Sequence, residues 1–294
     1  MISEAQLTTW TGLGSVQQSA ATYATIKAVL EDRDAPYAAR VGRVFLQGSY
    51  GNDTNVFGDS DVDIVIEQKG LWYYTLDEMT AQDQARYRQQ YADPATYTLD
   101  DFRVAVNAWL LQNYAGDIDP AGRKAVKIRP RNNRRSADVV IAAPFRRYIT
   151  YQNDPGTFVR GIQIHPFSGG YITNYPDLHS QRLTELHQAS GGRLKPTIRI
   201  FKNMRNKLVN DGLLAKTDAP SYFIEGLLTN VPTPLFQNSH QGTVASVVEF
   251  VSSSDLSQFR TGSRQHLLIR DNEQSAWSAA NFQAYWARIC ALCA

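Results

Sequence analysis

The first half of the chain alternates short apolar runs with longer segments of mixed polarity, a pattern typical of strands between helices. The predicted strands cover residues 41–47, 62–67, 125–128, 137–142, 146–151 and 159–165. The predicted helices of this half cover residues 15–31, 78–91 and 99–114. A turn is expected at 153–156, because Asn, Asp, Pro and Gly follow one another there.

After Pro176 the short apolar runs disappear and the pattern is helical. The predicted helices cover residues 177–189, 194–209, 221–229, 242–252 and 272–291. The sequence therefore predicts an α/β (α+β) protein with two lobes. A core lobe with a mixed sheet and a long N-terminal helix is expected over residues 1–170, and a helical lobe over residues 171–294.

Composition and charge narrow the classes of function. The chain has 294 residues and a formal net charge of +2. Proteins that grip long DNA or RNA usually carry a marked basic excess, so this near balance favours small anionic substrates. No apolar run reaches the roughly 20 residues of a membrane helix, and the N-terminus lacks a signal-peptide pattern. We therefore expect no membrane contact and a cytoplasmic location.

Two carboxylates stand at the start of the second predicted strand. Asp61 and Asp63 are two residues apart, so their side chains project from the same face, while Val62 and Ile64 turn toward the core. Two neighbouring carboxylates repel each other, and a divalent cation relieves that repulsion. Carboxylates and phosphate oxygens are ligands that Mg²⁺ prefers, and two such ions can act together in a phosphoryl displacement.

A Gly-Ser pair follows the preceding strand. Gly48 lets the backbone approach a triphosphate closely, and a helix that begins near Ser49 would direct N–H groups at it. The hydroxyl of Ser49 can donate to a phosphate oxygen. An isolated Asp-x-Asp is most often a solvated turn and an isolated Gly-Ser carries no signal. In this order, each at the end of a predicted strand, the two together predict a site for metal and phosphate.

This stretch resembles the signature of the polymerase-β-like nucleotidyltransferase superfamily. Its details resemble the cGAS/DncV-like nucleotidyltransferases of bacterial anti-phage systems, most closely the CdnE-like branch, and the resemblance covers most of the chain. The matching residues are Gly48-Ser49-Tyr50, Thr54 and Gly58-Asp59-Ser60-Asp61-Val62-Asp63.

The resemblance implies an enzyme that binds nucleoside triphosphates between two lobes and joins them into a cyclic di- or trinucleotide, with release of pyrophosphate. It also implies two Mg²⁺ ions, for which Mn²⁺ can substitute, and a downstream effector protein reached through the product. Two alternatives stay open. One is transfer of nucleotides to RNA or to a protein. The other is a non-enzymatic nucleotide-binding module, which would be expected to lack at least one catalytic acid.

The family carries a third carboxylate on a later core strand, and Asp138 in the run 136–141 matches it. An acid within an apolar strand needs a partner, because burying an unpaired charge costs several kcal/mol. A salt bridge to Arg134 or Arg146 is the alternative. Asp61, Asp63 and Asp138 are therefore the predicted catalytic and metal-binding residues.

Three residues of the helical lobe match the family's nucleotide-binding positions. The resemblance implies that Ser221 contacts the triphosphate, that Tyr222 stacks on a base and that Lys202 binds phosphate. The alternatives are a plain helix cap for Ser221, a good N-cap residue after Pro220, and core packing for Tyr222. The cations that compete for the phosphate role of Lys202 are Lys195, Arg199 and Lys207.

Asn174 precedes Tyr175-Pro176 at the predicted boundary between the lobes. Its amide offers an acceptor and donors, which match the N3–H and O4 of uracil together. We therefore predict ATP and UTP among the substrates and at least one uridine in the product. The alternative is a turn-forming asparagine that caps the following helix.

The remaining candidates are expected to be structural. The basic cluster could bind a polyanion, but a loop of this polarity is more often simply exposed, and the histidines show no metal-ligand spacing. Two cysteines without further ligands nearby predict ordinary thiols. These residues are Arg129, Arg131, Arg134, Arg135, His165, His179, His187, Cys290 and Cys293.

Overall fold

The computed structural model describes residues 2–14, 16–57, 61–119, 124–271, 273 and 275–293. Contacts divide the chain into two compact units, which are treated separately below. The sheet unit comprises Gln17–Leu46 and Asp61–Tyr175. The helical unit comprises Met1–Val16, Gln47–Ser60 and Pro176–Ala294.

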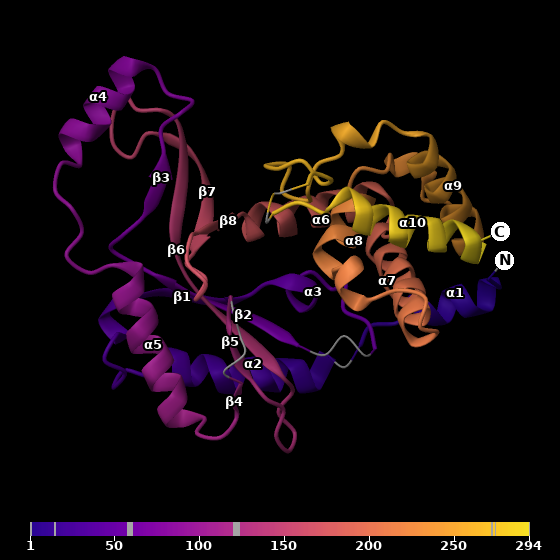
Figure 1. Cartoon of the computed structure of the whole chain (residues 1–294), viewed down its shortest axis with the longest axis horizontal. Coiled ribbons are helices and arrows are strands. Elements are labelled where there is room, and N and C mark those ends of the chain that lie inside the picture. Colours follow the sequence, from indigo (N-terminus) through magenta and orange to yellow (C-terminus); the bar gives the residue numbers. More distant parts are fainter. Residues whose placement is uncertain are drawn as a thin grey trace. The chain divides into compact units, whose positions relative to one another are not determined.

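The sheet unit contains one mixed eight-stranded sheet (Figure 1). Its strands are β1 Val41–Leu46, β2 Val62–Gln68, β3 Tyr73–Thr75, β4 Ile118–Asp119, β5 Val126–Ile128, β6 Ala137–Thr150, β7 Thr157–Ile164 and β8 Ile172–Asn174. The order is β1-β2-β6-β5-β4, while β3 and β7 also pair with β6, and β8 pairs with β7. Strands β2 and β3 run parallel to β6, and the other pairs are antiparallel.

Strand β6 organises the sheet, because four other strands pair with it. The sequence pattern predicts two strands in this region, whereas the structure has one of 14 residues. Pro144 falls between Ala142, where pairing with β2 ends, and Phe145, where pairing with β3 begins. A proline is tolerated where a strand lacks a partner on one side, so the strand continues through it.

The helices of the sheet unit are α2 Val16–Leu30, α4 Ala81–Gln90 and α5 Leu99–Asn113, with a 3₁₀ turn at Ala38–Arg40. Helix α2 packs on the sheet and on α5. The hydroxyl of Tyr23 donates to the carbonyl of Val44 at 3.0 Å, and the indole N–H of Trp109 donates to the carbonyl of Val29 at 3.0 Å. The expected long N-terminal helix is therefore present as α2, and it contacts strand β1 through Tyr23.

The helical unit is built around α7, which contacts α1, α6, α8, α9 and α10 (Figure 1). Its helices are α1 Glu4–Trp10, α3 Gly48–Gly51, α6 Pro176–Ala189, α7 Leu194–Asn210, α8 Ser221–Leu228, α9 His240–Ser253 and α10 Ala279–Cys293, with 3₁₀ turns at Lys216–Asp218, Thr233–Leu235 and Leu256–Gln258. Ile198, Phe201 and Met204 on α7 are fully buried. The predicted start of the last helix at residue 272 is wrong, because the bridge between Ile269 and Trp277 precedes α10.

The predicted fold class is confirmed: a mixed sheet with flanking helices is followed by a helical C-terminal part. From residue 176 onward, the described residues contain helices and isolated bridges but no strand. No helix within the described ranges is both long and apolar enough to span a bilayer.

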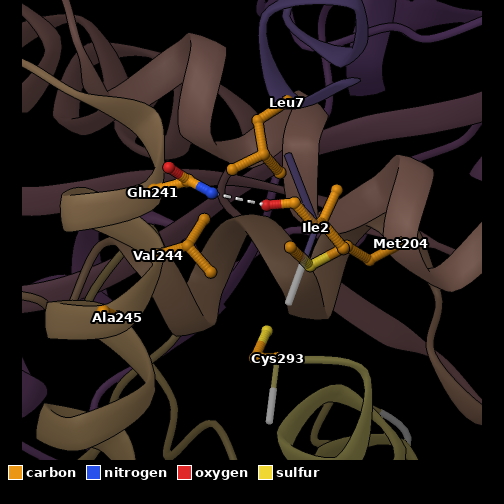
Figure 2. A pocket seen from close by; sticks show the side chains of 7 residues that line it. All are labelled: Ile2, Leu7, Met204, Gln241, Val244, Ala245 and Cys293. Carbon is orange, nitrogen blue, oxygen red and sulfur yellow. Dashed lines mark hydrogen bonds between the residues drawn. The ribbon is translucent and has the colours of Figure 1, made fainter. Parts of the chain in front are cut away.

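The N-terminal segment docks on α9 of the helical unit. The carboxylate of Glu4 accepts hydrogen bonds from the backbone N–H groups of His240 and Gln241, each at 2.7 Å. The side chain of Gln241 donates to the carbonyl of Ile2 at 2.8 Å, beside a small apolar cavity of about 40 Å³ (Figure 2). Burial raises the pKa of Cys293 at this cavity to about 11. A thiol with a raised pKa stays protonated and unreactive at neutral pH, which fits the prediction that the cysteines have no special chemistry.

Replacing Glu4 tests this docking contact. A carboxylate at a helix N-terminus stabilises the helix, so Glu4→Gln should lower the free energy of unfolding by about 1 kcal/mol at pH 7. The two backbone hydrogen bonds lower the pKa of Glu4. The stabilisation is therefore present above the ordinary glutamate pKa of about 4.3 and is lost as the pH falls below it.

The matched control is Glu249→Gln in the last turns of the same helix α9. A carboxylate near a helix C-terminus is unfavourable, so this variant should keep or slightly raise the stability measured by urea denaturation. If Glu4→Gln and Glu249→Gln lower the free energy of unfolding equally at pH 7, the capping role of Glu4 is contradicted.

Candidate active site

The predicted site residues lie in both units of the structure. The sheet unit carries Asp61, Asp63, Asp138 and Asn174. The helical unit carries Gly48, Ser49, Lys202, Ser221 and Tyr222. Gly58-Asp59-Ser60, which contribute to the predicted signature, lie outside the described residues.

The carboxylates of the sheet unit lie on two adjacent strands. Strands β2 and β6 pair in parallel with Asp63 opposite Asp138, so both side chains project from the same face of the sheet. Asp61 immediately precedes β2. Val62 and Ile64, which alternate with the two acids of the Asp-x-Asp motif, are fully buried as predicted.

Asp138 has no arginine partner of the predicted kind. The guanidinium of Arg134 donates to Asp117 at 2.7 Å, and that of Arg146 donates to the hydroxyl of Tyr148 at 3.0 Å. The salt-bridge alternative for Asp138 is therefore wrong. Its Oδ1 atom is buried, and none of the described residues donates a hydrogen bond to it.

A lysine that the sequence reasoning missed stands among these acids. Lys127 on β5 lies opposite Asp138 in the antiparallel register, and its Nζ lies 3.4 Å from Oδ2 of Asp61. Burial lowers the pKa of Lys127, but the carboxylates of Asp61 and Asp138 outweigh burial, and the pKa lies above its usual value. The sequence does carry a signal for Lys127, because this lysine interrupts an apolar run in the same way as Asp138 does.

The electrostatics leave Asp138 under-compensated. Burial raises the pKa of its carboxyl group, the charge of Asp61 raises it further, and Lys127 opposes both effects. A buried carboxylate with an unpaired oxygen beside another carboxylate is chemically suited to a divalent cation. As placed, no three His, Cys, Asp or Glu side chains in the described part of the chain form a group that could hold a metal ion. In this structure, the cation that contacts Asp61 is the ammonium group of Lys127.

In the helical unit, the Gly-Ser pair begins the short helix α3. Gly48 has φ +66°, in the left-handed region that favours glycine. The backbone N–H of Asn52 donates to the carbonyl of Gly48 at 3.2 Å, and that of Thr54 donates to the carbonyl of Ser49 at 2.9 Å. The predicted helix near Ser49 is therefore present, and the following residues fold back on it.

Lys202 does not have the surroundings expected of a phosphate ligand. Its side chain is fully buried, and its Nζ donates to Oε1 of Glu225 at 2.7 Å and to the carbonyl and hydroxyl of Thr54 at 3.1 and 3.3 Å. An ammonium has three N–H donors, so these partners occupy all of them. Lys202 contacts the loop that follows Ser49, and its contact with phosphate stays a prediction.

Two of the three competing cations contact the same loop. Lys195 lies 3.1 Å from a carboxylate oxygen of Asp53, and Arg199 donates to the carbonyl of Asp53 at 2.5 Å. The third, Lys207, pairs with Asp211 one turn later on α7. The first half of α7 therefore carries the cations that hold the loop.

Ser221 and Tyr222 begin helix α8. Pro220 occupies the N-cap position and Ser221 is the first helical residue, so the helix-cap alternative for Ser221 is wrong. The ring of Tyr222 is half-buried and stacks on His179, with centroids 5.1 Å apart and planes 21° from parallel. Part of the predicted core packing of Tyr222 is thus present on one face of the ring.

Asn174 is the last residue of β8, and α6 begins at Pro176. Its side-chain Oδ1 accepts a hydrogen bond from the backbone N–H of Tyr175 at 2.8 Å. This local bond is of the kind expected from the turn-forming alternative. A uracil N3–H would compete with Tyr175 for the same oxygen.

Comparison with known proteins identifies the family. A curated cyclic UMP-AMP synthase from Rhodothermus marinus is 34% identical over 279 residues, which is 94% of this chain and 92% of the relative. The chain belongs to the cGAS/DncV-like nucleotidyltransferases. The model of their C-terminal helical domain matches residues 181–293.

Further relatives of this family agree in fold. The structure of the Rhodothermus marinus CdnE c-UMP-AMP synthase with Apcpp and Upnpp has a TM-score of 0.87 and 31% identity, covering 99% of this chain and 96% of that chain. A curated cyclic dipurine nucleotide synthase from Elizabethkingia meningoseptica is 28% identical over 247 residues, 84% of this chain and 82% of the relative. The predicted resemblance to the CdnE branch is therefore confirmed.

The basic cluster of the predicted hairpin is largely paired within the sheet unit. Arg131 and Arg134 lie 3.6 and 2.7 Å from the carboxylate of Asp117, and Arg129 lies 3.7 Å from that of Asp119. These contacts neutralise much of the positive charge that a polyanion would need.

Replacing Asp138 tests the electrostatic account. Because its folded-state pKa is raised, the charged carboxylate destabilises the folded protein at pH values above the ordinary aspartate pKa of about 3.9. Asp138→Asn should therefore raise the free energy of unfolding at pH 7 in EDTA. The gain should disappear as the pH falls below that value.

Asp117→Asn is the control with the opposite sign, since the hydrogen bond from Arg134 lowers the pKa of Asp117. Its removal should lower stability at pH 7, as measured by chemical denaturation. A loss of stability in Asp138→Asn equal to that in the control would mean that Asp138 is a satisfied structural group.

Proposed function

We propose that this nucleotidyltransferase joins nucleoside triphosphates into a cyclic di- or trinucleotide that acts as a second messenger in anti-phage signalling, through a downstream effector. The observation that carries the proposal is the register of β2 and β6, which puts Asp63 and Asp138 on one face of the sheet beside Asp61. The 34% sequence identity to a cyclic UMP-AMP synthase, which extends over 94% of this chain, supports a cyclic product.

In this proposal Asp61, Asp63 and Asp138 hold two Mg²⁺ ions, for which Mn²⁺ can substitute. When bound, these cations would offset the negative charge of the triphosphate. Support comes from the buried, unpaired Oδ1 of Asp138 and from the raised pKa of its carboxyl group.

The chain's other predicted residues bind and orient the nucleotides. Gly48, Ser49 and Ser221 contact the triphosphate, and Tyr222 stacks on a base with the ring face that His179 does not cover. The hydroxyl of one nucleotide attacks the α-phosphate of another and displaces pyrophosphate, and a second such attack closes the ring. The residues contribute mainly by positioning the reacting groups.

For base choice we propose ATP and UTP as substrates, with Asn174 at the edge of the uracil. The relative from Rhodothermus marinus is named for a product that contains UMP, and the relative from Elizabethkingia meningoseptica for purine products. The amide of Asn174 offers both an acceptor and donors, which a uracil edge can use.

Removing a catalytic carboxylate tests the activity. Asp63→Asn should lower product formation at least 1,000-fold, which corresponds to roughly 4 kcal/mol of activation barrier, while the protein stays folded. The control is Asp34→Asn, an exposed residue of the turn after α2 in the same unit, which should keep its activity. The measurement uses radiolabelled nucleoside triphosphates, with and without RNA.

Wild-type turnover without RNA or a protein acceptor separates the proposal from nucleotide transfer to a polymer. Label that appears only on added RNA, or on the protein itself, would support the alternative. Undiminished turnover of Asp63→Asn would reject the assignment of the catalytic centre.

Replacing Asn174 tests base choice. Serine keeps a small polar side chain but lacks the paired donor and acceptor of the amide, so Asn174→Ser should shift incorporation from uridine toward purines. Mass spectrometry of products formed from all four nucleoside triphosphates measures the change. A wild-type product that contains only purines would contradict the proposed base preference, whatever the variant does.

A further inference from the structure

A single buried carboxylate connects the loop after Ser49 to three helices of the helical unit. Glu225 on α8 is 2% exposed, and each of its oxygens accepts two hydrogen bonds. The donors are Lys202 Nζ at 2.7 Å and Thr54 Oγ1 at 2.5 Å to Oε1, and His179 Nε2 at 2.8 Å and Asn52 Nδ2 at 3.4 Å to Oε2. Four donors match the capacity of a carboxylate.

The charge on Glu225 makes this arrangement rigid. Burial alone would raise the pKa of Glu225, but Lys202 and His179 outweigh burial and hold the pKa well below its usual range. A buried carboxylate that loses its cationic partner becomes an uncompensated charge, which is strongly destabilising. The donors from the loop and from the helices are therefore held to one geometry.

Two residues of the loop, Thr54 and Asn52, connect this carboxylate to the Gly-Ser pair by hydrogen bonds. Thr54 donates its hydroxyl to Glu225 and its backbone N–H to the carbonyl of Ser49, at 2.9 Å. Asn52 makes the parallel connection, from Glu225 to the carbonyl of Gly48 at 3.2 Å. The position of the Gly-Ser pair thus depends on a side chain that is distant in sequence.

The same carboxylate also supports the start of α8. Ser221 and Tyr222 precede Glu225 by four and three residues, so all three lie near one face of the helix. His179, which bonds Glu225, stacks on the ring of Tyr222. A Cβ added at Gly262 would lie 2.4 Å from Nδ1 of His179, so the backbone there packs directly against the histidine.

We propose that Glu225 is a positioning residue for triphosphate binding, which acts through Thr54 on Ser49 and through His179 on Tyr222. The inference rests on the proposed function only in taking these two segments as the nucleotide-binding ones. A loop rich in Gly, Ser, Asn and Asp would otherwise have to be ordered when the nucleotide binds, at a cost in conformational entropy. Glu225 fixes the loop before binding.

Thr54→Val tests this role with little disturbance of the buried charge. It removes a hydroxyl that donates to Glu225 and accepts from Lys202 at 3.3 Å, keeps the shape of the side chain and leaves Lys202 and His179 bonded to Glu225. The probe is Apcpp, a non-hydrolysable ATP analogue, whose binding is measured by calorimetry with Mg²⁺. We expect the Kd to rise about tenfold. The matched control is Thr229→Val, at the buried C-cap residue of α8, whose hydroxyl donates to the carbonyl of Gly226 at 2.8 Å.

Both threonine variants should lose stability, Thr54→Val the more because its hydroxyl bonds charged groups, and only Thr54→Val should bind Apcpp more weakly. Equal Kd values for the two variants would overturn the proposal. A second test pairs Glu225→Leu with Lys202→Met. Each single variant leaves a buried charge unpaired, while the double variant leaves none and should recover much of the lost stability.

The double variant should nevertheless bind Apcpp as weakly as Glu225→Leu does, because Thr54 and His179 still lack their acceptor. If the double variant recovers its affinity for Apcpp together with its stability, Glu225 has a structural role only, and the proposal is overturned. Apcpp binding does not require product formation. A wild type that binds Apcpp but forms no ring would therefore reject the proposed function alone, and one that does not bind would reject both.

Discussion

The buried ion pair between Lys202 and Glu225 is the constraint on which the helical unit depends. Removing both charges from water is costly, and the cost is recovered only when every remaining donor and acceptor finds a partner. Thr54, Asn52 and His179 complete the set. This explains why residues 47–60 belong to the helical unit although they lie in sequence between two strands of the sheet.

The sheet unit shows the opposite electrostatic character. Asp63 and Asp138 project from one face of two parallel strands, and Lys127, which contacts Asp61, offsets the charge of Asp138 only in part. A fold selected for stability alone would not leave Oδ1 of Asp138 buried without a donor. Such under-compensated groups are typical of functional sites, where the missing interaction is supplied by what binds there.

The sequence predicted the long elements well and the short ones poorly. Helices such as α5 and α7 follow a clear apolar periodicity, whereas β3, β4 and β8 are too short to show one. Asp63 and Asp138 could be nominated from the motif and the resemblance. The role of Glu225 could not, because its partner Thr54 is 171 positions away and no local pattern encodes that contact.

The stoichiometry of pyrophosphate release tests the central claim, that the product is cyclic, most directly. Closing a ring displaces one pyrophosphate for each nucleotide incorporated, whereas a linear dinucleotide keeps one triphosphate and releases one pyrophosphate for two nucleotides. Coupled detection of pyrophosphate, with nucleotide incorporation counted in the same reaction of the wild-type chain, gives the ratio. The account predicts a ratio of about one, with a product that phosphatase leaves intact. A ratio near one half, with a phosphatase-sensitive product, would contradict it.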